Sequence, residues 1–375
     1  MKVMTVLDLD PRKLGSFEEY TISLSQSLTS VGGKSILVFN NLPPESLRPL
    51  YLESGAILET KCFVPFGRQS ASVLRELVRR YRPHVVHFHF VNLFSLDLIA
   101  VALSSGARVF YSDHASDVSK KRSMVRWWAL QARTRALSSL VSRFIAPSAY
   151  VKGRLVRQGV SEKKVTVIHN GVNLQGFGKT SGEDGLRARY GIDSGSMLVS
   201  SISQLIPEKG VPDLIDAAAL AIGKGANLAF VHVGDGPFGE EYRARVRKLG
   251  IEKRFIFTGL LNMPEVAAIL RGSDVFTLPC TWGEAFSLVV LEALAAGKPA
   301  IVTAVGGNTE AVEDGRNGLV VPPHDPAALA AALIELHDNP DRRQAMARES
   351  VARSTYFSVK RWVDETISLY AQWAS

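Results

Sequence analysis

The chain has 375 residues, of which 46% are hydrophobic and 21% charged, and its formal net charge is +8. This length exceeds what one ordinary hydrophobic core organises, so we expect two domains, and the composition excludes an intrinsically disordered chain. No apolar run approaches the roughly 20 residues of a membrane-spanning helix, and the N-terminus lacks the regions of a signal peptide. Cys62 and Cys280 form no CxxC pair, which disfavours a zinc site or disulfide framework and fits a cytoplasmic location.

Apolar strand-like runs alternate with helix-period stretches in the first part of the chain. The strand-like runs are VMTVLDL (3–9), KSILVFN (34–40), HVVHFHF (84–90) and ARVFYSD (107–113). Helices are expected over about 17–30, over 70–81 and between the last two runs. Such alternation predicts right-handed βαβ units and a parallel sheet.

A second series follows the polar, glycine-rich stretch Gln175–Gly185. It consists of MLVSSIS (197–203), a helix over 211–222, NLAFVHVG (227–234), a helix over 240–249, RFIFTG (254–259), DVFTLPC (274–280), PAIVTAV (299–305) and GLVVPP (318–323). We therefore predict an α/β fold of two doubly wound, Rossmann-like parallel sheets joined by a linker. Ligands of such sheets bind beyond the carboxyl ends of the strands, and two facing sheets would form a cleft.

Small and polar residues follow the predicted strands of the first half. Gly15 and Ser16 open a helix in a loop where backbone N–H groups can approach a phosphate or a sugar, although an ordinary strand-to-helix turn has the same residues. His89 and His114 each close a strand, so we expect both imidazoles at one edge of the sheet. A packing role is the favoured interpretation of His89, whereas His114, beside Asp113, is the better candidate for a site.

In the second half, Lys209 lies between a strand end and a helix start, where a cation can meet phosphate charge. Gly234, Gly236 and Gly239 match the letters G-x-G-x-x-G of a dinucleotide fingerprint. The next strand ends in Thr258–Gly259, without the acidic residue that would bind the ribose. This departure argues against a dehydrogenase.

The most informative segment runs from Glu284 to Glu292. We expect Glu284 in a loop and a helix that begins near Ser287, whose unpaired N–H groups suit a diphosphate. On the first turns of that helix, Glu292 would accept hydrogen bonds from a ribose, while Glu284 would hold sugar hydroxyls beyond the phosphates. The pair predicts a nucleotide-sugar site, and the alternative is one capping and one surface glutamate.

A set of short motifs follows in a fixed order along almost the whole chain. They are Gly15–Glu18, Val85–His89, Ala146–Ser148, Asn170–Asn173, Glu208–Gly210, Gly234–Pro237, Phe257–Gly259, Glu284 with Glu292, Gly306–Glu310 and Asp314–Gly318. In this order and spacing, the chain resembles the family-four retaining glycosyltransferases of the GT-B fold, the glycosyl transferases group 1.

The resemblance implies a hexosyltransferase-type enzyme of the EC 2.4 class. Such an enzyme moves a sugar from a nucleotide diphosphate to an acceptor hydroxyl with retention, giving an α-linkage, in cell-surface polysaccharide or glycolipid synthesis. It also implies an acceptor-side domain over residues 1–174, to which a helix at 357–375 returns, and a donor-binding domain over residues 186–356.

By the same resemblance, Lys209 would neutralise the diphosphate, Glu284 would bind the transferred sugar, and His114 would lie against the far edge of that sugar. Further donor contacts would come from Gly15 and Ser16 over the phosphates, the loop glycines Gly234 and Gly236, Leu260 and Leu261 beside the base, the N–H groups of Phe286, Ser287 and Leu288, and Glu292 at the ribose.

One departure concerns Gln204, which stands where the family commonly has an arginine. One of the two cationic side chains expected to bind the diphosphate is therefore missing. Either Lys209 with the helix N–H groups suffices, or another basic residue such as Arg12 or Lys13 replaces the arginine. No Asp-x-Asp pair closes a predicted strand, so we expect no metal and no cofactor. The frequency of donors in the family suggests a UDP-sugar.

Ten lysines and arginines lie between Lys120 and Arg157, with no Asp or Glu among them. A solvated basic face is the simplest interpretation. The alternative is attraction to an anionic membrane at its inner face, which Trp127 and Trp128 favour and which would suit a carbohydrate or lipid-linked acceptor. No nucleic-acid-binding motif accompanies the charge.

Two other functions remain open at this point. A nucleotide-sugar epimerase on the same scaffold would interconvert donor sugars without an acceptor. A catalytically weak protein that binds membrane surfaces would use the basic stretch alone.

Overall fold

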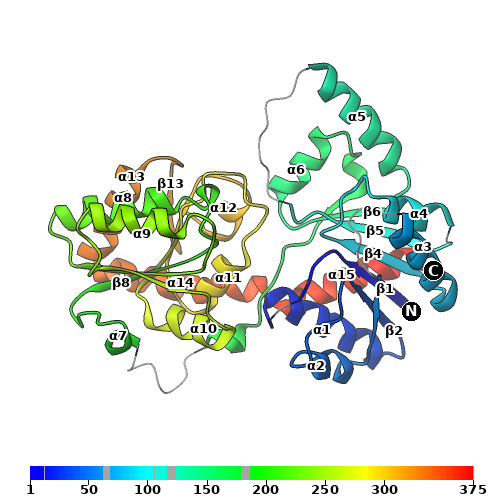
Figure 1. Ribbon diagram of the computed structural model, residues 1–375, viewed down its shortest axis with the longest axis horizontal. Helices are drawn as coiled ribbons and strands as arrows, with labels where there is room; N and C mark the ends of the chain where they lie inside the picture. Colours follow the sequence, from blue (N-terminus) through cyan, green and yellow to red (C-terminus); the bar gives the residue numbers. More distant parts are fainter. Residues whose placement is uncertain (12, 62–67, 105, 116–123, 179–185, 375) are drawn as a thin grey trace. The chain divides into compact units, whose positions relative to one another are not determined.

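The computed structural model describes residues 1–374 apart from 12, 62–67, 105, 116–123 and 179–185, and these residues form two compact units (Figure 1). Unit 1 consists of the described residues of Met1–Ala115, Ser119–Gly171 and Val359–Ser375, and unit 2 of those of Val172–Ser358. The chain passes from unit 1 to unit 2 at Val172, which is already buried in a core of unit 2, and the expected boundary was residue 174.

Unit 1 is built on a seven-stranded parallel sheet in the order β3-β2-β1-β4-β5-β6-β7. Its strands are β1 (Lys2–Leu7), β2 (Lys34–Phe39), β3 (Ala56–Thr60), β4 (Val85–His89), β5 (Arg108–Ser112), β6 (Arg143–Ala146) and β7 (Val165–Val167). The strand order reverses between β1 and β4, and ligands of doubly wound sheets bind beyond such a switch point.

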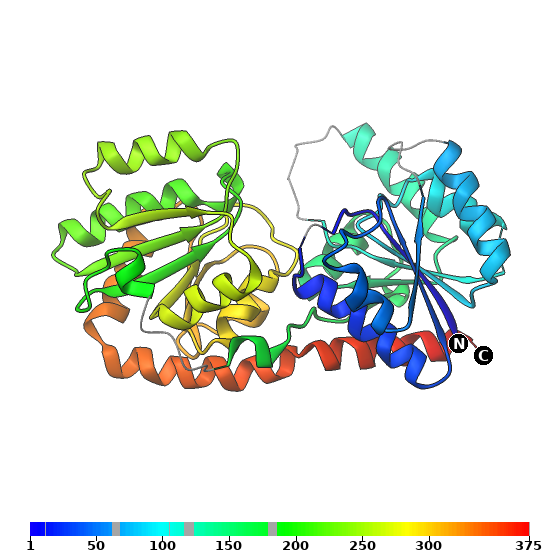
Figure 2. The same cartoon turned by 60° about the horizontal axis from the view of Figure 1, so that its bottom comes forward.

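The helices of unit 1 include the last one of the chain. They are α1 (Ser16–Ser30), α2 (Arg48–Glu53), α3 (Arg68–Tyr81), α4 (Leu96–Ser104), α5 (Met124–Ser138), α6 (Ala149–Arg157), the short 3-10 helix η1 (Glu162–Lys164) and α15 (Val359–Ala374). The red α15 lies beside α1 in Figure 2, and Trp362 stacks on Tyr20 with ring centroids 3.7 Å apart. The C-terminal helix therefore completes the core of the unit that also contains the N-terminus.

Unit 2 contains a six-stranded parallel sheet in the order β10-β9-β8-β11-β12-β13. Its strands are β8 (Met197–Ile202), β9 (Leu228–Val233), β10 (Phe255–Gly259), β11 (Val275–Leu278), β12 (Ala300–Thr303) and β13 (Gly318–Val321). Here the strand order reverses between β8 and β11, which pair directly through Val199 and Val275.

Helices cover both faces of this second sheet. They are α7 (Leu186–Arg189), α8 (Val211–Gly223), α9 (Gly239–Lys248), α10 (Met263–Gly272), α11 (Leu288–Ala295), α12 (Asn308–Ala311), α13 (Pro326–Asp338) and α14 (Pro340–Ser354), with the 3-10 helices η2 (Leu174–Phe177), η4 (Pro207–Lys209) and η5 (Thr355–Phe357). Successive residues of β8 point to opposite faces, so Met197 and Val199 join one core and Leu198 the other.

The predicted fold class is confirmed, since both sheets are parallel and doubly wound. Strands β3, β6 and β7 do not appear among the runs named from the sequence. Strands β6 and β7 have only four and three residues. Strand β3, AILET, is mostly half-buried and lacks a continuous apolar run.

Candidate active site

Lys209 and Glu284 meet beyond the switch point of unit 2. The loop after β8 leads to Lys209, and the loop after the neighbouring strand β11 carries Glu284. Lys209 Nζ lies 2.6 Å from Glu284 Oε2, and the two side chains are 19% and 13% exposed. Two residues 75 positions apart in the chain thus form an ion pair that is largely shielded from water.

The Glu284 carboxylate receives two further hydrogen bonds. Trp282 Nε1 donates to Oε2 at 3.3 Å and Cys280 Sγ at 3.6 Å. Burial raises the pKa of the Cys280 thiol, and the nearby Glu284 carboxylate raises it further, so the thiol remains a donor. All three contacts use Oε2, and the other oxygen of Glu284 takes no part in them.

Lys209 remains an ammonium group in this environment. Burial lowers the pKa of Lys209, but the Glu284 carboxylate together with smaller contributions from Cys280 and Glu208 outweighs that effect and raises the pKa above its ordinary value. Beyond the carboxyl ends of β8 and β11, the pair therefore places a lysine ammonium group beside a carboxylate that its hydrogen bonds hold in one orientation.

Two glycines allow the backbone to hold this arrangement. A Cβ atom at Gly306 would lie 2.1 Å from Glu284 O, and the Gly307 N–H donates to that same oxygen at 2.8 Å. A Cβ atom at Gly210 would lie 1.7 Å from Pro279 O. Both residues have positive φ, +64° and +69°, so larger residues would meet both strain and a backbone clash.

A backbone clash also accounts for the first two glycines of the G-x-G-x-x-G letters. Cβ atoms at Gly234 and Gly236 would lie 1.9 Å from Ser203 O and 2.5 Å from Leu205 O. These two glycines let the loop after β9 pack on the loop after β8, a role that involves no dinucleotide. Gln204, between those two contacts, is exposed.

The helix expected near Ser287 begins at Leu288, with Ser287 as the N-cap residue. The Ser287 N–H donates to Asn308 Oδ1 at 3.1 Å, so it would have to exchange partners to contact a phosphate. Phe286 and Glu292 are buried, at 4% and 6% exposure. Glu292 thus lies on α11 as expected, and its burial contradicts the alternative interpretation of this residue as a surface glutamate.

Asn308 was not selected from the sequence, although its Gly306–Glu310 motif was. Its side chain is 1% exposed, and among the described residues Nδ2 has no hydrogen-bond partner. A buried amide donor without a partner, beside the start of α11, belongs to the candidate site. Its only sequence signal was a polar residue directly after two glycines.

Beyond β10, Leu260 is 74% exposed, whereas Leu261 packs partly against a core of unit 2. An exposed leucine at a strand end offers an apolar surface to a ligand. This feature fits the role that the resemblance assigns to Leu260.

In unit 1, three histidines form a hydrogen-bonded row: His87 within β4, His89 at its end and His114 beyond the end of β5. His89 Nδ1 lies 2.9 Å from His114 Nε2, and His89 Nε2 lies 3.1 Å from His87 Nδ1. Burial lowers the pKa of His87 and His89 well below the ordinary value and that of His114 to about 4. All three imidazoles are therefore neutral near pH 7, and the expected proximity of His89 and His114 is observed.

The loop that carries His114 is held by a buried ion pair. Arg154 Nη2 lies 2.9 Å from Asp113 Oδ2, with side chains 5% and 10% exposed. The His114 ring also stacks on Phe90 with centroids 4.5 Å apart. Phe90 is a non-glycine residue at φ +60°, a costly conformation that concentrates at functional sites.

Gly15 is the N-cap residue of α1, and Ser16 is buried at its first position. A Cβ atom at Gly15 would lie 2.8 Å from Glu18 Oε2, so this loop leaves room for the Glu18 side chain to fold back. Arg12 lies outside the described residues, and Lys13 is exposed.

The basic stretch does not form one uniform solvated face. Arg154 is buried in its pair with Asp113, and Arg133 lies over the Phe94 ring at 4.3 Å. Lys120, Lys121 and Arg122 lie outside the described residues. The interpretation as a simple solvated face is therefore wrong at Arg154, because a guanidinium group opposite a buried carboxylate is retained for pairing.

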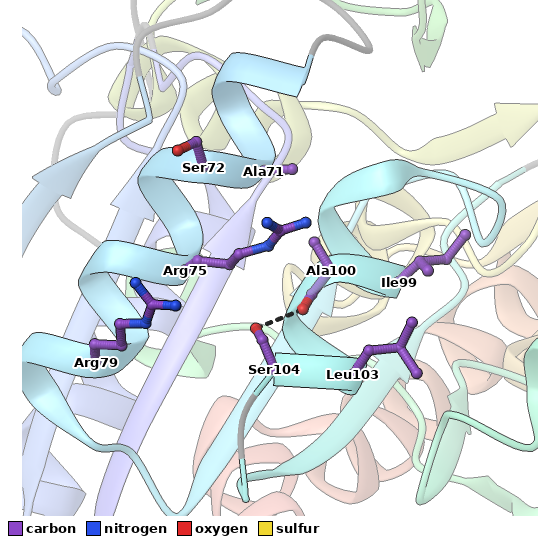
Figure 3. Close-up of a pocket in the computed structure, with 8 residues that line it drawn as sticks. All are labelled: Ala71, Ser72, Arg75, Arg79, Ile99, Ala100, Leu103 and Ser104. Carbon is purple, nitrogen blue, oxygen red and sulfur yellow. Dashed lines mark hydrogen bonds between the residues drawn. The ribbon is translucent and has the colours of Figure 1, made fainter.

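Figure 3 shows a pocket between α3 and α4 of unit 1, with Arg75 and Arg79 on one side and Ile99 and Leu103 on the other. It contains none of the residues selected from the sequence, and both arginines are exposed. We therefore do not assign the donor to it.

Among the described residues, no group of three or more His, Cys, Asp or Glu side chains could hold a metal ion. No helix in the described part of the chain has both the length and the apolar character needed to cross a bilayer.

The histidine row predicts a pH dependence. Because its folded-state pKa values lie below the unfolded value of about 6.5, the unfolded chain binds more protons below that pH. The contribution of the neutral histidines to the free energy of unfolding is complete above pH 6.5. We expect the urea midpoint of unit 1 to fall as the pH drops from 6.5 toward 4. His114→Gln should make this fall shallower, and His84→Gln, at an exposed histidine of the same unit, should not. Equal slopes for wild type and His114→Gln would contradict the assignment.

Two family models match this chain. The model described as Glycosyltransferase Family 4 matches residues 17–175, and the model described as Glycosyl transferases group 1 matches residues 183–353. A D-inositol 3-phosphate glycosyltransferase of Streptomyces scabiei is 32% identical over 238 residues, which cover 61% of this chain and 53% of the relative. The chain thus spans about half the length of this relative.

Two further similarities extend over more of the chain. EpsD of Bacillus subtilis is 27% identical over 317 residues, or 82% of each chain. HepE of Anabaena, solved in complex with UDP, superposes with a TM-score of 0.82 at 21% identity over 99% of this chain and 100% of its own. With the two family models on its two Rossmann-like units, the chain belongs to the family-four glycosyltransferases of the GT-B fold.

Proposed function

We propose that the chain transfers a sugar from a nucleotide diphosphate to an acceptor hydroxyl and retains the anomeric configuration. The observation that carries the proposal is the Lys209–Glu284 pair at the switch point of unit 2. A cation there suits the diphosphate, and Glu284 Oε1, which takes no part in the three contacts described above, suits a sugar hydroxyl. UDP, which HepE binds, is the nucleotide we propose first.

The chemistry follows from where charge develops. Breaking the bond between the anomeric carbon and the phosphate oxygen leaves negative charge on the nucleotide diphosphate, which Lys209 and the N–H groups at the start of α11 would stabilise. The acceptor oxygen forms the new bond on the same face, and its proton passes to the departing phosphate oxygen. This route needs no carboxylate nucleophile and no metal, so we expect EDTA to leave the rate unchanged.

The remaining donor contacts are part of the same proposal. His114, Gly15 and Ser16 would be the donor contacts that unit 1 supplies. Gly234 and Gly236 would shape the phosphate loop, and Leu260 with Leu261 would flank the base. The donor-binding domain would be residues 186–356, and the acceptor-side domain would be residues 1–174 together with 357–375.

Removing Lys209 tests the proposal directly. Lys209→Ala should lower the transfer rate by about 10²–10³, the effect of removing one group that stabilises developing charge. The readout is nucleotide release with a matched acceptor, beside a thermal unfolding midpoint. Lys224→Ala, at an exposed lysine of the same unit, is the control. An unchanged rate in Lys209→Ala would contradict the assignment of Lys209 to the diphosphate.

A donor incubated without acceptor separates a transferase from an epimerase. A transferase gives only slow hydrolysis, whereas interconversion of the donor sugar would show epimerase chemistry. A thermal-shift screen across nucleotide diphosphates and their sugars identifies the donor. Liposome binding without a shift from any of these nucleotides would indicate the alternative, a catalytically weak protein that binds membrane surfaces.

Gln204 offers a test by gain of affinity. Its side chain is exposed in the loop after β8, where the family commonly has arginine. Gln204→Arg would add a permanent cation and bidentate donors for phosphate, so we expect several-fold tighter binding of the nucleotide diphosphate by calorimetry. Gln204→Met, with similar volume and no charge, should not tighten binding. Equal affinities for the arginine and methionine variants would show that position 204 does not reach the diphosphate.

We also propose that α5 docks unit 1 on an anionic membrane. Met124, Trp127 and Trp128 are 77%, 41% and 57% exposed on this helix, and the two indole rings form an edge-on pair with centroids 4.9 Å apart. Exposed tryptophans beside basic residues are typical of interfacial helices. Such docking at the inner membrane face would bring the enzyme to a lipid-linked acceptor.

Vesicle co-sedimentation tests this docking. The double variant Trp127→Ala/Trp128→Ala should bind phosphatidylglycerol vesicles at least about tenfold more weakly, because the apolar area that enters the interface is lost. Tyr356→Ala, at an exposed aromatic residue of unit 2, is the control. Binding that is equally strong to neutral phosphatidylcholine vesicles would contradict an electrostatic contribution.

A further inference from the structure

Trp282 contacts both members of the Lys209–Glu284 pair. Its indole Nε1 donates to Glu284 Oε2 at 3.3 Å, and Lys209 Nζ lies 5.6 Å from the centre of its ring. An ammonium group within about 6 Å of an indole ring is attracted to the electron-rich face of that ring. One side chain, which was not selected from the sequence, therefore contacts the cation through its ring and the carboxylate through its N–H.

Backbone contacts fix the position of Trp282. The Glu284 N–H donates to Trp282 O at 2.9 Å across a three-residue turn. Thr281, the residue before Trp282, is bound to the loop after β8, because its N–H and its hydroxyl both donate to Glu208 O, at 2.9 and 3.4 Å. Since Glu208 and Thr281 are the chain neighbours of Lys209 and Trp282, the same contacts bring the ammonium group and the indole together.

The hydrogen bonds to Glu284 Oε2 have only one possible direction. An indole N–H and an ammonium group can only donate, and the Cys280 thiol keeps its proton. Lys209, Trp282 and Cys280 therefore all donate to this one oxygen. The carboxylate is held through Oε2, and none of these three contacts uses Oε1.

Two of the three donors carry no charge. A bound diphosphate would compete with the Glu284 carboxylate for the Lys209 ammonium group, because opposite charges attract at this range. Cys280 is fully buried and Trp282 is fixed by its turn, so both neutral donors stay at Oε2. Glu284 can thus keep its orientation while Lys209 turns to the phosphates.

We propose that Trp282 is a positioning residue for the transferred sugar. Together with Cys280 it holds Glu284 Oε2, so that Oε1 is presented to one hydroxyl of the sugar. This inference rests on the proposed function, in which Glu284 binds that sugar. Because the Glu284 side chain is only 13% exposed, a sugar without a hydroxyl at this place would leave a charged acceptor unpaired. Sites of this kind discriminate strongly between substrates.

The Trp282–Glu284 bond can be measured by NMR on the full chain without any ligand. The chain has five tryptophans, so ¹⁵N-tryptophan labelling gives five indole N–H signals, and Trp282→Phe identifies the signal of Trp282. We expect this signal to move upfield in Glu284→Gln, because a neutral amide oxygen accepts more weakly than a carboxylate. A Trp282 signal that stays in place or moves downfield would overturn the inference.

Calorimetry with UDP and UDP-glucose as probes tests the positioning role. Trp282→Phe keeps an aromatic ring for Lys209 but removes the N–H, so we expect an unchanged affinity for UDP. UDP-glucose should bind about tenfold more weakly, which is the effect of losing one hydrogen bond to a charged group. Equal losses for the two probes, or no loss for either, would overturn the positioning role.

Trp373→Phe is the matched control. Trp373 is also half-buried and also lies beside a cation, with the Arg143 guanidinium 4.9 Å from its ring centre, but it belongs to unit 1. This variant should leave both affinities unchanged, and a loss for UDP-glucose here would contradict a specific role of Trp282. If Trp282→Phe does not fold, Cys280→Ala, which removes the other neutral donor, should show the same loss for UDP-glucose alone.

The two measurements separate this inference from the proposed function. The NMR experiment contains no donor, so a wild type that shows the bond but binds UDP and UDP-glucose equally would contradict only the assignment of Glu284 to the sugar. A wild type that binds UDP-glucose more tightly than UDP, beside a Trp282→Phe variant with wild-type affinities, would contradict only the positioning role.

Discussion

The pairing of β8 with β11 is the constraint on which the candidate donor site depends. β8 and β11 are neighbours in the parallel sheet although they are far apart in the sequence, so both strands end at the same edge of the sheet. The strand order reverses between them. The loops after these strands therefore leave side by side, and Lys209 and Glu284 come within 2.6 Å. Without this pairing, neither the lysine nor the glutamate would have its partner.

Close backbone packing makes that pairing specific. Gly210, Gly234 and Gly306 each lie where a Cβ atom would approach a carbonyl oxygen within about 2 Å. These contacts join the loops after β8, β9, β11 and β12 into one layer above the sheet edge. The charged groups of the site are thus supported by backbone, and their positions do not depend on long flexible side chains alone.

Unit 1 uses a different physical device at its own switch point. Its strand ends carry neutral, buried imidazoles, and the C-terminal helix supplies Tyr370, 283 positions from His87 in the chain. Burial that would be costly for charged histidines is tolerated because each ring nitrogen of His87 and His89 has a hydrogen-bond partner. The return of α15 therefore contributes to this hydrogen-bonded row and also to the core.

The sequence by itself determined the doubly wound fold, because alternating apolar runs and helical periods are local patterns, and it singled out Lys209, Glu284, Glu292 and His114 through strand ends and motif order. Only the tertiary structure revealed the Lys209–Glu284 bond, the Asn308 Nδ2 group that has no hydrogen-bond partner among the described residues, the burial of Arg154 and the row from His114 to Tyr370. Each of these depends on which distant segments meet, and on which atom faces which. Local patterns contain no record of either, since pairing across a sheet is decided by packing between elements far apart in the chain.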